Sequence, residues 1–188
     1  MTTMSTTRRL TADEFLAGDF PRGAQLIEGE VIVNDPGFWH QELCLRVVLA
    51  LRSWVDSEPG HGRVGFGGNW RLDARSLYKP DVWWTGAGRE PDLATARHDV
   101  APDLAIEVRS PGTWVHDIGT KRRVYEQNGT PELWLVDGFG RVVLVYARSK
   151  PGVSRFDIEA ELGLSHALVS PLLPGFKLGV DELFADAP

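Results

Sequence analysis

The chain has 188 residues, which fits one domain over residues 1–188, with its core at about 20–185, and is too short for two comfortable ones. With 43% hydrophobic and 24% charged residues the composition is globular, and we expect neither a signal peptide nor a membrane span, which needs roughly 18 apolar residues in a row. The net charge of −6 does not favour nucleic-acid binding, although a local basic patch would suffice for it.

The chain begins with a short helix and a pair of strands. Thr11 and Glu14 have the spacing of a capping box, which predicts a helix over residues 10–17. Residues 24–34 are typical of two strands around a turn at Gly29.

The longest helix is expected over residues 40–57, where apolar side chains recur at three- and four-residue spacing. Cys44 lies in this helix and is expected to be a buried apolar residue rather than a nucleophile. Because it is the only cysteine, it excludes an internal disulfide, and we expect a reducing, cytoplasmic compartment.

The second half of the chain contains mostly strands. Residues 114–129 predict a helix that ends at Gly129 and contains Gly119, while residues 86–100 match no element. The order of elements predicts an α/β (α+β) fold, a mixed layer of helices and strands around one central sheet. Strands are expected within residues 62–73, 79–86, 103–110, 131–137 and 141–149, and short strands with a final helical turn within residues 155–184.

Two acidic residues stand in apolar strand patterns. Glu107 interrupts the run of residues 104–108, and burying an ionised Glu costs several kcal/mol unless it is paired or binds a cation. Asp81 precedes a similar run. If these strands are adjacent, about 5 Å apart, both carboxylates could bind Mg²⁺ or Mn²⁺, which favour oxygen ligands. Alternatively, Asp81 caps a turn and Glu107 pairs with Arg109 or Lys121.

Helical geometry adds a third group. Asp117 and Lys121 are four residues apart, so they share one helix face and could form an ordinary helix pair worth a few tenths of a kcal/mol. If that face turns towards the sheet, Lys121 points at the strand of Glu107, where it could position an attacking water or stabilise developing charge. Alternatively, Lys121, Arg122 and Arg123 form a solvated basic helix face.

These motifs together resemble the Uma2 family, also called DUF820, of restriction-endonuclease-like proteins. The likeness extends from about Gln25 to Phe184. The matching elements are Pro80-Asp81, Glu107-Val108-Arg109-Ser110-Pro111, Asp117 with Lys121, Tyr125, Gly129 and the strand Pro131-Glu132-Leu133-Trp134-Leu135-Val136-Asp137.

The resemblance implies a PD-(D/E)XK nuclease fold, a mixed central sheet flanked by helices. Asp81 and Glu107 would be the acidic pair that binds Mg²⁺ (or Mn²⁺), and Lys121 would be the catalytic lysine, relocated to the following helix. Arg109 stands where the superfamily usually has that lysine; it could hold a phosphate but would be a poor base. Asp117 would be an auxiliary residue beside Lys121.

Two further positions bear on the resemblance. Gln25 stands where the family usually has an acidic residue of the active site; its carbonyl could bind a metal or a water, but it brings no negative charge. Glu28 and Glu30 are nearby, but a regular strand would turn both away from that face. His40 matches a histidine of the family, although an isolated His is more often a helix cap or a packing residue.

Three functions remain open at this point. The first is a metal-dependent endonuclease that hydrolyses DNA. The second is a nuclease-fold module that binds nucleic acid or protein with weak or no catalysis, which Gln25 favours. The third is a glycosidase with a carboxylate pair, which the apolar strand context and Lys121 argue against. The resemblance also leads us to expect a homodimer, with DNA as substrate and no membrane partner.

Overall fold

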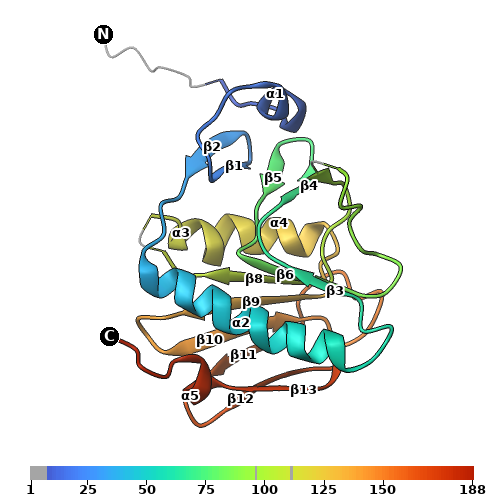
Figure 1. Ribbon diagram of the computed structural model, residues 1–188. Helices are drawn as coiled ribbons and strands as arrows, with labels where there is room; N and C mark the ends of the chain where they lie inside the picture. Colours follow the sequence, from blue (N-terminus) through green and yellow to red (C-terminus); the bar gives the residue numbers. More distant parts are fainter. Residues whose placement is uncertain (1–7, 96, 111) are drawn as a thin grey trace.

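A six-stranded mixed sheet forms the centre of the protein in a computed structural model, which describes residues 8–95, 97–110 and 112–188 (Figure 1). The strand order is β11-β10-β9-β8-β6-β3. β8 and β9 are parallel and the other neighbours are antiparallel. The strands are β3 (Arg63–Gly65), β6 (Val82–Thr85), β8 (Leu104–Val108), β9 (Glu132–Asp137), β10 (Val142–Ala147) and β11 (Ile158–Leu162).

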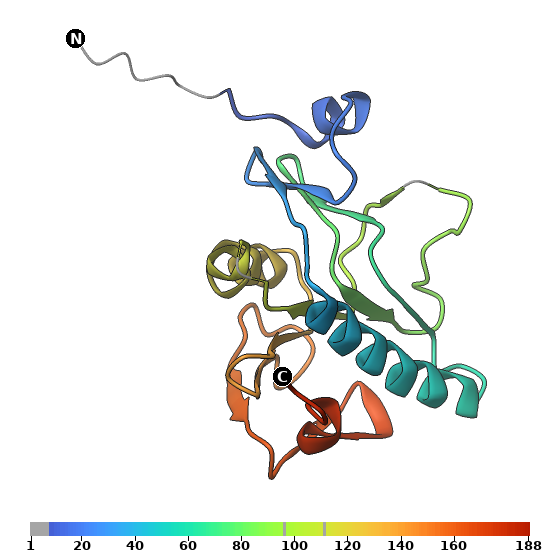
Figure 2. The same ribbon diagram turned by 60° about the vertical axis from the view of Figure 1, so that its left-hand side comes forward.

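Each face of this sheet is covered by a helix (Figures 1 and 2). Because side chains alternate along a strand, Ile106 of β8 packs towards the long helix α2 (Phe38–Ser57), whereas Ala105 packs towards Tyr125 on the helix opposite. That opposite helix is continuous and consists of α3 (Trp114–His116), η1 (Asp117–Lys121) and α4 (Arg122–Gln127). The face of α2 is completed by β12 (Ala167–Ser170), β13 (Leu173–Gly179) and α5 (Val180–Leu183).

A second sheet with the order β2-β1-β5-β4-β7 lies beside the first. Contacts between aromatic side chains join this second sheet to the central sheet and to the helix of residues 114–127. Tyr78 meets Tyr125 edge to face at 5.4 Å, and Trp70 meets Trp83 at 5.0 Å. Its strands are β1 (Ala24–Ile27), β2 (Glu30–Val33), β4 (Asn69–Asp73), β5 (Ser76–Tyr78) and β7 (Arg97–His98), with α1 (Ala12–Ala17) packed against them.

The mixed α/β architecture and most of its elements confirm the sequence predictions. Thr11 and Glu14 form the expected capping box of α1. The turn between β1 and β2 has positive φ at both Glu28 (47°) and Gly29 (84°), which is the backbone form that favours Gly in a tight hairpin. Two elements were missed, β5 and β7. They have only three and two residues, too few to show an alternating pattern. Pro111 of the family motif lies outside the described residues.

The helix of residues 114–127 contains a π-helical turn, η1, where the sequence predicts only an α-helix with an internal Gly119. It ends as expected, with Gly129 at φ 84° after the cap Asn128. π turns occur frequently at functional sites. Here the turn begins at Asp117 and ends at Lys121, and both side chains are buried, with 1% exposure each. Of the alternatives, the helix face turned towards the sheet is therefore confirmed, and a solvated basic face is wrong for Lys121.

Glu132 at the start of β9 is a second buried acid, and it offers a test of the packing. Its carboxylate accepts hydrogen bonds from Trp134 Nε1 and Ser170 Oγ, both at 2.6 Å, and burial raises its pKa. A raised folded-state pKa means that the stability contribution of Glu132 is present at low pH and is lost as pH rises. We therefore expect the difference in free energy of unfolding between the wild type and Glu132→Gln to shift in favour of the Gln variant between pH 5 and pH 8.

Urea unfolding of both proteins at these two pH values measures this difference, since all other titrating groups are shared. A difference that does not change with pH would show that Glu132 is not titrating in this range.

Candidate active site

Asp81 and Glu107 lie opposite one another on adjacent strands. β6 and β8 pair antiparallel with Val82 facing Ile106, so the next position outward brings Asp81 opposite Glu107. The strands of Asp81 and Glu107 are therefore adjacent, as binding of one cation by both carboxylates requires. Asp81 stands one residue before β6 rather than inside a strand, and its Oδ2 accepts a hydrogen bond from the Val108 amide at 2.7 Å.

Glu107 is held on both carboxylate oxygens. Lys121 Nζ donates to Oε2 at 2.9 Å, and Tyr125 Oη donates to Oε1 at 2.8 Å. The same ammonium lies 3.0 Å from Asp117 Oδ1, while Thr113 Oγ1 donates to Asp117 Oδ2 at 3.1 Å. The structure thus brings three predicted site residues, Glu107, Asp117 and Lys121, into one buried cluster. Of the two sequence alternatives for pairing Glu107, it shows Lys121 rather than Arg109.

The carboxyl groups of this cluster outnumber its one ammonium. Burial raises the pKa of Glu107, attraction to Lys121 opposes this, and repulsion from Asp117 and Asp81 adds to it. Burial likewise raises the pKa of Asp117. For Lys121, burial alone would lower the pKa, but Glu107, Asp117 and Asp81 outweigh it and raise the pKa. Three carboxyl groups therefore lie near one ammonium, and a divalent cation would favour their ionised forms.

A pocket of about 380 Å³ opens beside Asp81 and gives access from solvent. Gln25 and Lys79 line it, and the Gln25 side-chain oxygen accepts a hydrogen bond from the Lys79 amide at 3.1 Å. Burial lowers the pKa of Lys79, and no carboxylate of the described residues lies within 4.0 Å of its ammonium. Lys79 is therefore the pocket cation that is free to meet an anionic ligand.

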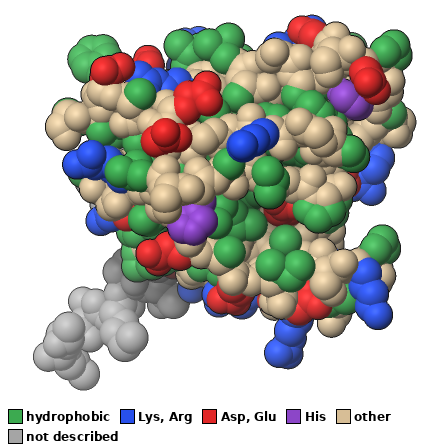
Figure 3. All heavy atoms as spheres, turned by 90° about the horizontal axis from the view of Figure 1, so that it is seen from below, with side chains coloured by type: hydrophobic (Ala, Val, Ile, Leu, Met, Phe, Trp, Pro, Cys, Tyr) green, Lys and Arg blue, Asp and Glu red, His purple; other side chains and the backbone are tan. Residues whose placement is uncertain are grey.

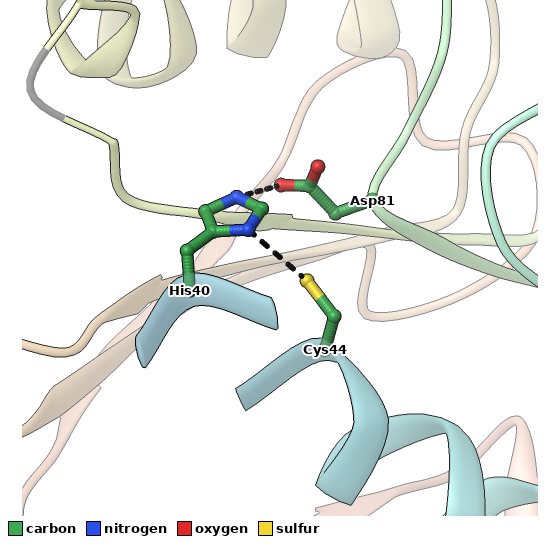
Figure 4. A group of neighbouring side chains, drawn as sticks. All are labelled: His40, Cys44 and Asp81. Atoms are coloured by element: carbon green, nitrogen blue, oxygen red, sulfur yellow. Dashed lines mark hydrogen bonds and ion pairs between the residues drawn. The ribbon is translucent and has the colours of Figure 1, made fainter. Parts of the chain in front are cut away.

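His40 and Cys44 form the α2 side of this pocket (Figure 4). His40 Nε2 lies 3.1 Å from Asp81 Oδ2, and Cys44 Sγ lies 3.6 Å from His40 Nδ1. The three side chains place a nitrogen, a sulfur and an oxygen within 4.8 Å of one another. His40 thus lies at the site, as its match to the family histidine predicts. Cys44 packs against the hydrophobic core and burial raises the pKa of its thiol, as expected for an apolar residue rather than a nucleophile. Its sulfur also contacts His40.

Arg109 is directed away from the pocket. Its guanidinium donates to Asp137 Oδ2 at 2.7 Å and stacks over the ring of Trp114 at 5.3 Å. Only a third of the side chain is exposed, so these contacts hold it in place. In this arrangement Arg109 holds the chain in place directly after the end of β8.

The acids near Gln25 also lie outside the pocket. Glu28 pairs with Arg123 and Glu30 with Arg9, both at the surface. This confirms that neither replaces the acid that Gln25 lacks.

Three residues of the site had no assigned role in the sequence analysis. Tyr125 and Cys44 stand four residues after Lys121 and His40, and this helical spacing could have placed them beside those residues. For Lys79 the sequence carries no such signal, because its place depends on the pairing of β1 with the chain before Asp81.

Comparisons with known proteins identify the family. Residues 17–181 match the model of the Uma2 family, which is described as "Putative restriction endonuclease". The crystal structure of a putative nuclease belonging to DUF820 from Anabaena variabilis ATCC 29413 is similar, with a TM-score of 0.80 and 21% identity over 93% of this chain and 97% of that chain. At this identity the likeness is one of fold. No curated protein gives a significant match. With most of its length matched, the chain belongs to the Uma2 family.

Proposed function

We propose that this protein is a metal-dependent endonuclease that hydrolyses phosphodiester bonds in DNA. The observation that carries the proposal is the placement of Asp81 opposite Glu107, beside an open pocket and next to Lys121. Membership in a family of restriction-endonuclease-like proteins supports the same reaction class.

The donor set fits Mg²⁺ or Mn²⁺, which prefer oxygen ligands. Oδ1 of Asp81 accepts no hydrogen bond from the described residues, and Figure 4 shows it pointing away from His40. Each oxygen of Glu107 accepts one hydrogen bond and keeps a further lone pair. When bound, such an ion would lower the pKa of a coordinated water and offset the charge of the scissile phosphate.

The other residues of the cluster position these ligands. Lys121 and Tyr125 fix the orientation of Glu107, and Lys121 favours its ionised form. His40 and the Val108 amide fix the orientation of Asp81. Lys121 is too deeply buried to touch a substrate, so we assign the contact with the phosphate to Lys79.

On one face of the molecule, the charge distribution favours local rather than broad contact with a nucleic acid. On the face seen from below in Figure 3, acidic and basic side chains are scattered among apolar ones. Lys79 instead supplies positive charge inside the pocket, and the largely exposed Phe66 at its rim offers a ring on which a base could stack.

A homodimer remains our expectation, since a duplex has two strands to cut. The exposed Phe38, Leu45 and Leu49 of α2 provide apolar surface for it. No helix of the described chain is long and apolar enough to cross a membrane.

The test is cleavage of single-stranded and duplex DNA by purified protein with Mg²⁺ or Mn²⁺, with and without a chelator. We expect cleavage that requires the metal.

Gln25 favours one alternative, a module that binds DNA without cutting it. Its side-chain oxygen already accepts the Lys79 amide, so it does not replace the missing acid as a charged ligand. DNA binding that needs no metal, without cleavage of any DNA form, would support this alternative and contradict the endonuclease.

Lys79→Ala is expected to reduce cleavage by about 10- to 100-fold, because a hydrogen bond to a charged group contributes about 1.5–3 kcal/mol. Metal affinity should change little, since Lys79 supplies no metal ligand. Lys177→Ala, which removes an exposed lysine of β13, is the matched control and should retain wild-type activity. Equal activity of both variants would remove Lys79 from the mechanism.

A further inference from the structure

The α2 side of the pocket has a donor set unlike that of the carboxylate pair. We propose that Cys44, His40 and Asp81 form a binding site for a thiophilic divalent cation such as Zn²⁺ or Co²⁺. Sulfur and imidazole ligands favour these ions, whereas Mg²⁺ favours oxygen alone. Cys44 is the only cysteine of the chain, so this chemistry is available at no other position.

The three ligands come from two rigid elements. His40 and Cys44 are four residues apart on α2, so their side chains lie one above the other on one helix face. Asp81 is fixed opposite them by the hydrogen bond from the Val108 amide. The nitrogen, sulfur and oxygen atoms already lie within 4.8 Å of one another.

A half-turn of the His40 ring and small rotations of the other side chains are needed for the three ligands to converge on one ion. Each ring nitrogen of His40 now contacts one neighbour, Nδ1 with Cys44 and Nε2 with Asp81, so the carbon Cε1 lies between them (Figure 4). A half-turn of the imidazole about its Cβ–Cγ bond exchanges Cε1 with Nε2 and places a nitrogen between the sulfur and the carboxylate. Tetrahedral zinc with bond lengths of about 2.0–2.3 Å holds neighbouring ligands roughly 3.5 Å apart, which small side-chain rotations then reach.

The fourth position of such an ion faces the pocket, since all three side chains line it. Three protein ligands with one open position are typical of zinc sites that bind a water or a ligand, whereas structural sites are closed by four protein ligands. The proposed site is therefore accessible from solvent and exchangeable.

Asp81 belongs to both donor sets. An ion bound by Cys44 and His40 would occupy the carboxylate that the proposed Mg²⁺ site needs, so Zn²⁺ would compete with Mg²⁺. This competition rests on the proposed function, whereas binding of the thiophilic ion does not.

The experiment is a titration of the metal-stripped protein with Co²⁺, followed by absorption spectroscopy. We expect a sulfur-to-cobalt charge-transfer band in the near ultraviolet that saturates at about one ion per chain. Because the chain has one cysteine, this band can only report Cys44. Cys44→Ser should remove the band, and His40→Ala and Asp81→Asn should each weaken cobalt affinity at least about tenfold. Circular dichroism verifies that the variants are folded.

Absence of the band in the wild type at saturating Co²⁺ would overturn the proposal. So would a band whose cobalt affinity is unchanged in His40→Ala, because it would reflect a lone thiol. The titration contains no DNA. A cobalt band in a protein that does not cut DNA would therefore support this site and contradict the proposed endonuclease. Mg²⁺-dependent cleavage without a cobalt band would support the endonuclease and contradict this site.

Discussion

Asp81→Asn is expected to lower metal-dependent DNA cleavage at least about 100-fold. Mutation of residues that only orient a metal ligand already lowers metal affinity or activity about 10- to 100-fold, and Asp81 is proposed to be a ligand itself. The Asn oxygen can still accept the Val108 amide, so the strand exit should remain in place. What the variant loses is the negative charge opposite Glu107, which a divalent cation requires. The rate of plasmid or oligonucleotide cleavage at saturating Mg²⁺ measures the effect.

Asp103→Asn is the matched control. Asp103 stands just before the other end of β8, where it accepts the Gly86 amide and pairs with Arg89. It is far along the strand from the pocket and is expected to keep most of the activity. If Asp81→Asn and Asp103→Asn cleave DNA at similar rates, Asp81 does not take part in the reaction.

Lys121→Met is expected to lower the free energy of unfolding by about 3–5 kcal/mol, the usual cost of removing one partner from a buried ion pair. The variant leaves Glu107 and Asp117 buried without the ammonium that both contact at 2.9–3.0 Å. Burial already raises the pKa of both acids, and without Lys121 the largest opposing interaction is lost. The folded variant therefore binds more protons than the unfolded chain, so the loss of stability is smallest at low pH and grows as pH rises.

A triple variant separates this electrostatic cost from lost packing. Glu107→Gln, Asp117→Asn and Lys121→Met together remove all three charges with little change in volume, and this combination should recover most of the stability. Urea unfolding of the single and triple variants at pH 5 and pH 8 measures both effects. A triple variant as unstable as Lys121→Met would show that packing of the lysine stem, rather than its charge, stabilises the cluster.

Local sequence patterns predicted most of the fold. The capping box of Thr11, the apolar spacing along residues 40–57 and the Gly129 cap each depend on neighbours in the chain, which the sequence shows directly. The division of the strands into three sheets, where the sequence predicts one central sheet, was not predictable in this way. It depends on pairing between distant strands, such as β1 with β5, and β5 has only three residues.

The sequence predicted those residues of the candidate site that near neighbours in the chain identify. An acid inside an apolar strand pointed to Glu107, and the spacing of Asp117 and Lys121 pointed to a shared helix face. That both residues are buried could not be read from four-residue spacing, since surface pairs have the same spacing. Lys79 and the sulfur of Cys44 enter the pocket only through tertiary packing.

The most direct test of the carboxylate pair is a calorimetric titration of the metal-stripped protein with Mn²⁺, beside Glu107→Gln. Glu107 is not part of the His40, Cys44 and Asp81 cluster, so its effect reports the pair alone. Binding in the wild type that Glu107→Gln weakens at least about tenfold would establish that the buried acid serves a metal. Absence of binding at millimolar Mn²⁺, or equal binding by both proteins, would contradict the account and leave Glu107 as the structural partner of Lys121.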